Sequence, residues 1–292
     1  MDKKAEINKI LITGVSGLVG SEICKNFLKN GCTVTGVVND ADSKISHSKY
    51  NEIKLDLTKD KLTASNLFDG VIHCAAVIPG QIKSEQELFN KNTAIDNSVM
   101  EFCKLNNLKL IYFSTAYMYQ SPVAKLTEEE ELKSNLQGYY LAKKRGEENL
   151  ASSKINYAIF RISSPYGNLA KQKNVMKLFA DKIKAKESVT LNGNGARAQN
   201  FIHTDDIYKA CLLALNNNKS GLYNLTYNKN YTMLDLANLI KKIYSSNSEI
   251  RFDTMKTDAE INLNFDNSKL KRELNWEPEM DLESGLIKTL LN

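Results

Sequence analysis

The sequence has few cysteines, few histidines and no long apolar run, and each shortage excludes something. No stretch approaches the roughly 20 apolar residues that a membrane-spanning helix needs, so we expect no membrane partner. The five cysteines include no Cys-x-x-Cys pair, which favours buried free thiols over disulfides. The three histidines, His47, His73 and His203, are too scattered for metal ligands, so no metal is expected.

Charge of one sign does not accumulate either. The net charge is +5, and lysines and acids are interspersed along the chain, with no basic stripe that carries interleaved aromatics. This pattern argues against a nucleic-acid partner and mildly favours anionic substrates. The polar N-terminus leads directly into the first expected strand, so we expect no signal peptide and a cytoplasmic protein. An acidic run at 128–131 is typical of a solvated loop or helix start.

The chain is organised around a strand, a glycine turn and a helix start. Ile10 to Ile12 form an apolar run without alternation, as in a strand buried on both faces, and helical spacing begins at Leu18. Between them, Gly14 would make the sharp turn, Gly17 would admit a pyrophosphate, and Gly20 would let the helix approach the strand. The stretch predicts a dinucleotide site. A glycine turn without ligand is the alternative.

Alternation of strands and helices continues to residue 161, which predicts an α/β fold with a doubly wound parallel (Rossmann) sheet. We expect a dinucleotide-binding domain at 1–165. The strands after the first are predicted at 33–38, 52–55, 71–76, 109–115 and 156–161, and the long helices at 85–106 and 136–150.

The pattern changes after residue 165 and predicts a smaller C-terminal α+β substrate domain at 166–292. The segment 200–220 is expected to return to the first domain, and no long linker separates the parts, so they should pack as one body with a cleft. The helices are predicted at 175–185, 204–215 (capped by Thr204), 233–244, near 270–274 and 282–291, and the strands at 188–191, 200–203, 222–225 and 249–252.

The second strand ends in Asn39 and Asp40. An acid at this point binds the ribose hydroxyls of NAD, whereas an arginine would suit the 2′-phosphate of NADP. Asn39 is neither, and Asp40 lies one position later. The residues favour NAD and leave NADP open.

Tyr139 and Lys143 lie one helical turn apart, and Thr115 ends a central strand at the edge where α/β sheets bind ligands. An ammonium and a cationic nicotinamide would both favour the phenolate, so Tyr139 could take a proton from a substrate hydroxyl while a hydride leaves its carbon. Thr115 would hold the same oxygen, and Lys143 the cofactor ribose. Tyr140 with Lys144 has the same spacing and is an alternative pair.

These motifs together resemble the extended short-chain dehydrogenase/reductase family, in its NAD-dependent sugar epimerase/dehydratase branch. The resemblance runs almost end to end, through TGVSGLVG, LDL, VIHCAA, YFSTAYMYQ, GYYLAKKRGEE, FRISSPYG and RAQNFIHTDDI. It assigns the catalytic hydroxyl to Thr115 in place of Ser114, and Glu147, four after the lysine, selects Tyr139 and Lys143.

The resemblance also implies which residues bind cofactor and substrate. The substrate would be a nucleoside-diphosphate sugar contacted by Ser164, Asn174, Val175 and Arg197. The cofactor would be contacted by Gly14, Gly17, Leu18, Val19, Gly20, Asn39, Asp56, Leu57, Cys74, Ala75, Ala76, Asn92, Tyr139 and Lys143.

Departures from the family pattern narrow the reaction. Ser164 replaces a substrate-contacting asparagine, and Gln120 replaces a glycine. Ala116 and Tyr117 stand where sugar dehydratases carry an Asp-Glu pair, and neither can serve as the acid or base of dehydration. This favours an epimerase, with a nucleotide-sugar ketoreductase as the alternative and a non-catalytic dinucleotide sensor as the rival of another class.

A homodimer is also expected. The helices at 85–106 and 136–150 are apolar over more than one stripe, and members of the family that the chain resembles commonly pair these helices into a four-helix bundle.

Overall fold

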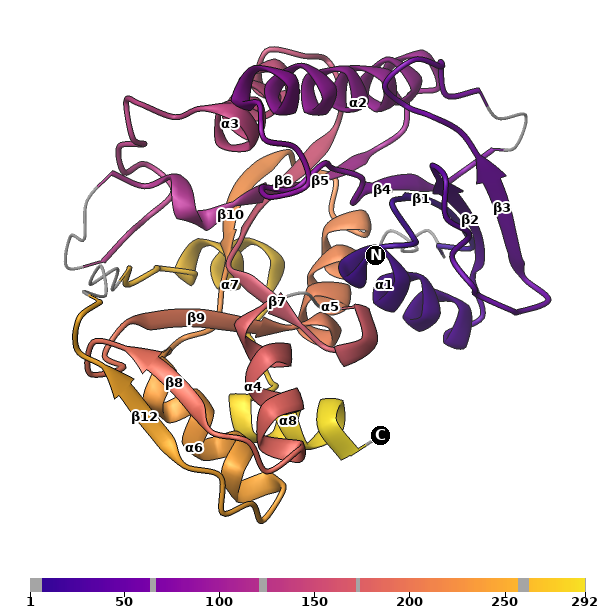
Figure 1. Cartoon of the computed structure of the whole chain (residues 1–292). Coiled ribbons are helices and arrows are strands. Elements are labelled where there is room, and N and C mark those ends of the chain that lie inside the picture. The colour runs from indigo at the N-terminus through magenta and orange to yellow at the C-terminus, as the bar shows by residue number, and fades with distance from the viewer. Residues whose placement is uncertain (1–6, 64–66, 121–124, 172–173, 257–262, 292) are drawn as a thin grey trace.

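Seven parallel strands form the central sheet of the computed structural model (Figure 1), which describes residues 7–63, 67–120, 125–171, 174–256 and 263–291. The chain starts in the middle of the sheet and builds outward in both directions, so the strand order reverses between β1 and β4. This confirms the predicted doubly wound α/β fold. In sheet order the strands are β10 (Gly221–Leu225), β6 (Tyr157–Ile162), β5 (Leu110–Thr115), β4 (Gly70–His73), β1 (Lys9–Thr13), β2 (Thr33–Val38) and β3 (Tyr50–Lys54).

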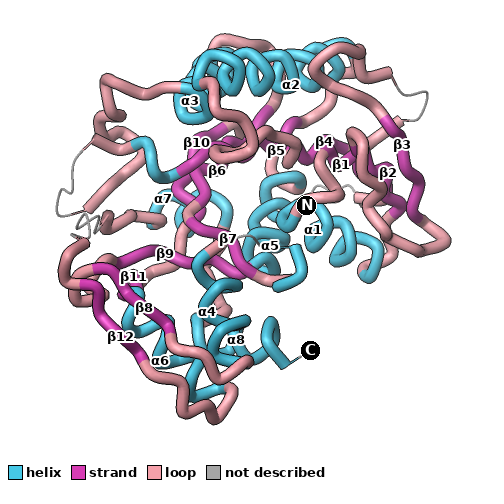
Figure 2. The backbone as a smooth tube through the Cα atoms, viewed as in Figure 1, coloured by secondary structure: helices cyan, strands magenta, loops and turns pink. Residues whose placement is uncertain are grey.

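Helices cover both faces of the sheet (Figure 2). One face carries α1 (Leu18–Lys29), α5 (Thr204–Leu215) and α7 (Ser268–Leu274), and the other carries α2 (Glu85–Leu105) and α3 (Gly138–Ala151). Because both faces are covered, the inner strands of the sheet are apolar without alternation, while the edge strand β3 is more polar. Ile10, Leu11 and Ile12, for example, are completely buried.

The C-terminal part builds a third core from short strands and three helices. Phe179, Leu236 and Leu286 are buried at its centre. One small sheet joins β11 (Asn230–Thr232), β9 (Ala198–His203) and β7 (Ser164–Tyr166), and a second pairs β12 (Ile250–Asp253) with β8 (Val189–Asn192). The helices are α4 (Val175–Lys184), α6 (Met233–Ile243) and α8 (Leu282–Leu291), and the 3₁₀ turns are η1 (Ala116–Met118) and η2 (Leu169–Lys171).

Segments beyond residue 200 join the larger unit. Helix α5 packs on α1, where the rings of Phe27 and Tyr208 meet edge to face with centroids 4.9 Å apart. Strand β10, just past the 200–220 segment, pairs with β6 in the main sheet. The Nε1–H of Trp276 donates to the carbonyl oxygen of Asp206 at 2.9 Å, which ties the chain after α7 to α5.

Several local expectations are wrong in detail. The strand predicted over 71–76 ends at His73, because the chain turns beside Gly14. Glu128, expected to be solvated, is buried and accepts a hydrogen bond from the backbone N–H of Asn224 at 2.7 Å. The cap of α5 is His203, whose Nδ1 accepts from the backbone N–H of Asp205, and Thr204 is the first helical residue.

The outward faces of α2 and α3 carry both charged and apolar side chains. Their exposed or half-exposed residues include charged side chains in ion pairs, such as Lys91 with Glu87 and Lys144 with Glu148. The buried apolar residues of both helices face the sheet, while Leu105 on α2 and Tyr140 and Leu141 on α3 are exposed apolar side chains. The dimer stays a prediction.

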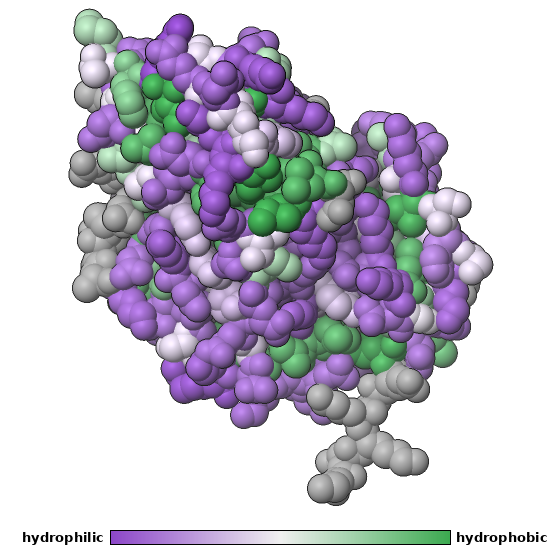
Figure 3. Space-filling view, turned by 90° about the horizontal axis from the view of Figure 1, so that it is seen from below, coloured by the Kyte–Doolittle hydropathy of each residue, from purple (hydrophilic) through white to green (hydrophobic). Residues whose placement is uncertain are grey.

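The molecular surface is mainly hydrophilic on the face shown in Figure 3, where hydrophobic side chains form separate small groups. Across the described ranges, we find no helix that combines the length and apolar character needed to cross a membrane. All five cysteines are free, and four of them are buried, as the sequence predicts.

A buried arginine anchors α3 to the sheet. Arg161, on β6, donates from Nε and Nη2 to both carboxylate oxygens of Glu147 on α3, at 3.0 and 2.7 Å. Its Nη1 donates to the hydroxyl of Tyr119 and to the carbonyl oxygen of Glu128, both at 3.0 Å. A bidentate pair supported by two further hydrogen bonds fixes both position and orientation.

We expect Glu147→Ala to lower the free energy of unfolding by about 3–5 kcal/mol, because it leaves the buried Arg161 guanidinium without a counter-ion. Urea unfolding measures this loss. The control is Glu148→Ala on the same helix, where an exposed carboxylate faces Lys144 at 3.9 Å, and the loss should stay below about 1 kcal/mol. Equal losses in the two variants would contradict the anchoring role.

Candidate active site

The glycine turn brings β1 into close contact with the loop after β4. Gly14 has φ of +70°, and a Cβ there would lie 2.7 Å from the backbone nitrogen of Ala75. A Cβ at Gly20 would lie 2.4 Å from the carbonyl oxygen of Gly14. Gly17 caps α1, and among the described residues no side chain caps this helix start. The open backbone N–H groups at such a start suit a phosphate, so the turn fits a dinucleotide pyrophosphate.

A chain of buried polar contacts leads from this turn across the sheet. The backbone N–H of Ala75 donates to Thr13 Oγ1 at 3.1 Å, and Thr13 Oγ1 lies 2.7 Å from His73 Nδ1. His73 Nε2 lies 2.9 Å from Asp96 Oδ1. Because a carboxylate can only accept, Nε2 carries the imidazole proton and Nδ1 accepts from the Thr13 hydroxyl. Burial lowers the pKa of His73 and keeps the ring neutral.

The chain of contacts ends at the predicted catalytic lysine. Asp96 Oδ2 accepts from the hydroxyl of Tyr112 at 2.6 Å, and Asp96 Oδ1 lies 3.8 Å from Lys143 Nζ. Lys143 Nζ also lies 4.5 Å from the ring centre of Tyr112 and 5.8 Å from that of Tyr139. Lys143, expected to face the cofactor and Tyr139, is thus a buried cation that faces Asp96 first.

The acidity of Tyr139 differs from the expectation. Burial raises the pKa of its hydroxyl well above the usual range, and the charges of Asp96 and Tyr140 act in the same direction. The sequence suggested a lowered pKa from the nearby ammonium, but that ammonium is closer to Asp96. The structure alone therefore describes Tyr139 as a neutral phenol, able to donate a proton.

Thr115 is the last residue of β5. Its Oγ1 accepts from the backbone N–H of Tyr117 at 3.3 Å, which leaves its hydroxyl hydrogen available for another oxygen. Ser114, the neighbouring hydroxyl, is completely buried. Successive side chains of a strand face opposite sides of the sheet. Only one of the two hydroxyls can therefore lie on the same side of the sheet as Tyr139.

A cavity of about 900 Å³ opens beside Tyr139. Four of the predicted site residues line it: Tyr139, Ser164, Asn174 and Arg197. Thr115, Lys143 and Val175 are not among its lining residues. Lys143 lies behind the tyrosine, and Val175 follows Asn174, whose side chain accepts from the backbone N–H of Lys177 and caps α4.

Three side chains that line this cavity are joined by hydrogen bonds. The hydroxyls of Tyr117 and Ser164 are 2.8 Å apart, and the amide nitrogen of Gln199 also donates to Ser164. The backbone oxygen of Asn200 accepts from Tyr117 at 3.3 Å. Tyr117 and Ser164 are two of the positions where the sequence departs from the family pattern, and the structure joins them in one cluster.

The remaining predicted cofactor residues lie at the start of α1, at the end of β2, after β3 and after β4. Asn39 and Asp40 are exposed at the end of β2, where Asn39 Nδ2 donates to Asp40 Oδ2 at 3.0 Å. The hydroxyl of Thr58 and the ammonium of Lys59 hold the pKa of Asp56 at about 2. The other predicted contacts are Leu18 and Val19 in the first turn of α1, buried Leu57, and Cys74, Ala75 and Ala76 after β4.

Asn92, a predicted cofactor contact, holds the loop after β4. It is completely buried on α2, and its amide bonds both the N–H and the carbonyl oxygen of Val77 at 2.9 Å. It also donates to the carbonyl oxygen of Leu88. These contacts pin the loop after β4, so Asn92 positions the loop that carries Cys74 to Ala76.

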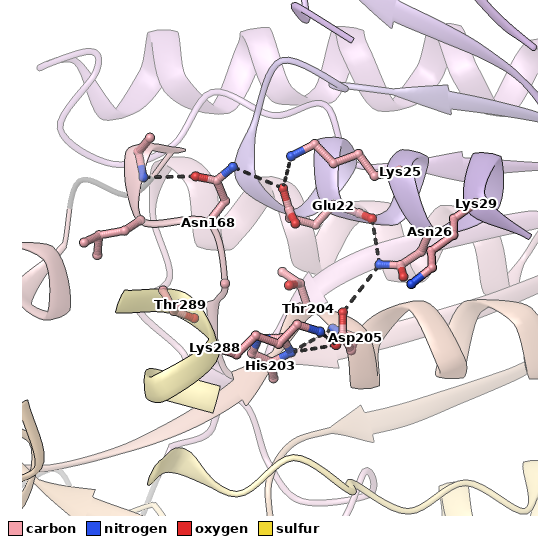
Figure 4. A pocket seen from close by; sticks show the side chains of 13 residues that line it. Glu22, Lys25, Asn26, Lys29, Asn168, His203, Thr204, Asp205, Lys288 and Thr289 are labelled. Carbon is pink, nitrogen blue, oxygen red and sulfur yellow. Dashed lines mark hydrogen bonds and ion pairs between the residues drawn. The ribbon is translucent and has the colours of Figure 1, made fainter. Parts of the chain in front are cut away.

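A second hollow, of about 490 Å³, lies between α1, α5 and α8 (Figure 4). Two ion pairs line it, Glu22 with Lys25 and Asp205 with Lys288, and Lys29 adds a further positive charge. None of the predicted catalytic residues lines it. We therefore place the candidate active site in the larger cavity beside Tyr139.

The sequence reasoning missed Thr13, Asp96, Tyr112 and Gln199. Asp96 lies between Ile95 and Val99 of the predicted apolar stripe, and a carboxylate beside such a stripe is the signal that could have found it. Gln199 had no comparable signal, because its partner Ser164 is 35 positions away in the sequence.

Comparisons with known proteins agree with the fold and the motifs. The chain matches a family described as "NAD dependent epimerase/dehydratase family" over residues 10–228, which confirms the resemblance. A "Putative UDP-glucose 4-epimerase" of Methanocaldococcus jannaschii is 27% identical over 301 residues, 97% of each chain.

Two solved structures have the same fold. A UDP-N-acetylglucosamine 4-epimerase from Methanobrevibacter ruminantium M1 has a TM-score of 0.85 at 23% identity, with 98% of both chains covered. A UDP-glucuronic acid 4-epimerase from Bacillus cereus, solved in complex with NAD, has a TM-score of 0.80 at 23% identity and covers 97% of this chain and 95% of its own.

We expect Gly14→Ala to abolish dinucleotide binding, measured by fluorescence titration, and to lower the melting temperature. The added methyl group would overlap the backbone of Ala75 at a φ that alanine rarely adopts. Gly31→Ala is the control, because Gly31 also has positive φ (+86°) but nothing within 4 Å of the added atom. It should cost about 1 kcal/mol and leave binding intact. Normal binding by the Gly14 variant would exclude this turn as the site.

Proposed function

Because the chain belongs to the NAD dependent epimerase/dehydratase family, we propose that it is an NAD-dependent nucleotide-sugar epimerase of the extended short-chain dehydrogenase/reductase type. One observation carries the proposal: Tyr139 lines the large cavity with the buried ammonium of Lys143 behind it. The epimerase names of the relatives reported above support the same reaction. The substrate is a nucleoside-diphosphate sugar.

The residues of the first domain fit NAD. Bound there, NAD would accept a hydride from a sugar carbon and return it. Gly14 and Gly17 would hold the pyrophosphate at the start of α1, and Lys143 the ribose hydroxyls near the nicotinamide. Asn39 and Asp40 would face the adenosine ribose, where the Asp40 carboxylate would repel a 2′-phosphate, so NAD is preferred over NADP.

Tyr139 is the acid–base group of this proposal. It takes the proton of the sugar hydroxyl during oxidation and returns it during reduction. The hydroxyl of Thr115, with its hydrogen still available, holds the same sugar oxygen. The positive charges of Lys143 and of oxidised nicotinamide favour the phenolate and oppose the effect of burial on the pKa of Tyr139.

The residues that line the cavity favour epimerisation, in which one sugar carbon is oxidised and reduced again, over dehydration of the sugar. Neither Ala116 nor Tyr117 has a carboxyl group for dehydration. Ala116 is completely buried, and the hydroxyl of Tyr117 is hydrogen-bonded to Ser164. Arg197 and Asn174 would lie along the diphosphate and nucleotide, with Val175 beside them, and Ser164 near the sugar. A ketoreductase would use the same residues and differ only in releasing its product after one hydride transfer.

We also propose a homodimer and a cytoplasmic location, as expected from the sequence. Since the outward faces of α2 and α3 carry charged residues as well as exposed Leu105 and Leu141, a dimer formed through them would combine polar and apolar contacts. The boundary between the two domains near residue 165 likewise stays a prediction.

Tyr139→Phe should lower turnover by about two to four orders of magnitude and leave NAD binding unchanged, because it removes only the hydroxyl that moves the proton. Steady-state kinetics and cofactor titration measure the two effects. Tyr140→Phe is the matched control, since Tyr140 also lines the cavity but its partner Lys144 faces Glu148 at the surface. The reverse pattern would assign the reaction to Tyr140.

The reaction itself is tested with a panel of nucleotide sugars. We expect the cofactor released from denatured protein to be NAD by mass spectrometry, and one sugar to be converted to an isobaric product without added cofactor. Turnover only with reduced cofactor and a keto sugar would identify a ketoreductase instead. Bound cofactor without turnover in either assay would favour a dinucleotide sensor, and bound NADP would overturn the NAD preference.

A further inference from the structure

Asp96 is a buried carboxylate that the proposed reaction does not use. It is 2% exposed, on the face of α2 that packs against the sheet and α3. Three donors from three different elements face it: Nε2–H of His73 on β4 at 2.9 Å, the hydroxyl of Tyr112 on β5 at 2.6 Å, and Nζ of Lys143 on α3 at 3.8 Å. A buried charge with this set of donors has its position fixed.

The surroundings of Asp96 leave little room for movement. A Cβ at Gly146 on α3 would lie 2.2 Å from the hydroxyl of Tyr112 and 3.0 Å from Asp96 Oδ2. The missing side chain of Gly146 therefore lets α3 pass directly over this hydrogen bond. Lys143, one turn earlier on the same helix, is held between the carboxylate and the ring of Tyr112.

The ammonium of Lys143 has two neighbours that matter for the reaction. It lies 3.8 Å from Asp96 Oδ1 and 5.8 Å from the ring centre of Tyr139. We propose that Asp96 is a positioning residue that holds the ammonium of Lys143 and competes with Tyr139 for it. The inference rests on the proposed role of Tyr139 and adds a residue that sets the pH at which Tyr139 works.

The electrostatics of the neighbouring groups agree with this competition. The attraction of Lys143 and the hydrogen bond from His73 lower the pKa of Asp96 against the opposing effect of burial, so the carboxylate is charged. Its charge contributes to the raised pKa of Tyr139. Other ionisable groups nearby are Glu147, which is paired with Arg161, together with Tyr140 and Cys74.

Asp96→Asn tests the inference because it removes the charge and keeps the shape. With Asp96 neutral, a negative charge near Tyr139 disappears and Lys143 can act on the phenol alone. The phenolate should then form at lower pH. We expect the acid limb of the profile of kcat/KM against pH to move to lower pH by about one unit.

Tyr112→Phe is the matched control. It removes one hydrogen bond to the same carboxylate, but it keeps the charge of Asp96 and the aromatic ring beside Lys143. In Tyr112→Phe, the acid limb of the profile of kcat/KM against pH should lie at the same pH as in the unsubstituted protein. Equal shifts in both variants would show that any disturbance of this cluster changes the profile, and would overturn the inference.

A spectroscopic titration separates this inference from the proposed function. Phenolate absorbance is followed against pH in the NAD-bound protein, with and without Asp96→Asn, and the curve of the matching Tyr139→Phe protein is subtracted to isolate Tyr139. No substrate is needed, so the test holds even if no nucleotide sugar is turned over. An unmoved Tyr139 titration in folded Asp96→Asn protein would overturn the inference. If the asparagine variant does not fold, Asp96→Ser makes the same comparison.

Discussion

The buried pair of Arg161 and Glu147 is the contact on which the site depends. It joins β6 to the helix that carries Tyr139 and Lys143, and the same guanidinium also bonds Tyr119 and the backbone of Glu128. The hydroxyl of Tyr119 in turn donates to Asn224 on β10 at 2.6 Å. One side chain thus sets the position of α3 against two neighbouring strands, and a buried charge held by four hydrogen bonds tolerates little displacement.

A second constraint links the cofactor turn to the catalytic helix. Thr13, directly before Gly14, contacts His73, which contacts Asp96, which faces Lys143. Each member is almost completely buried. Because buried polar groups are costly to leave unpaired, a displacement at one end of this chain of contacts disturbs its neighbours. The geometry therefore couples the place where a pyrophosphate fits to the lysine that faces Tyr139.

The cavity beside Tyr139 combines the predicted catalytic pair with a cluster of hydrogen-bonded side chains in its wall. Tyr139 and Lys143 are one helical turn apart, a spacing that is visible in the sequence. The cluster of Tyr117, Ser164 and Gln199 joins residues from three segments, because the phenol of Tyr117 and the amide of Gln199 both reach the hydroxyl of Ser164. This cluster forms part of the wall where a sugar would lie, and its shape bears on which sugar fits.

Local patterns in the sequence determined the elements and their order. The unalternating run at Ile10 to Ile12, the three glycines and the one-turn spacing of Tyr139 and Lys143 all concern residues that are close in the chain. Their geometry follows from strand and helix periodicity alone. For that reason the sheet, the glycine turn and the main candidate residues could be predicted, while element ends and the cap of α5 were wrong by a few residues.

Only the tertiary structure decided which groups face one another. His73 and Asp96 are 23 positions apart, and Thr13 and His73 are 60 apart, so no local period connects them. Contacts between residues far apart in the chain also decide three other features. They are the burial of Glu128, the role of Asn92 in holding a loop, and the pairing of Lys143 with Asp96. The ionisation of Tyr139 depends on desolvation and on charges from other elements, and both exist only once the chain has packed.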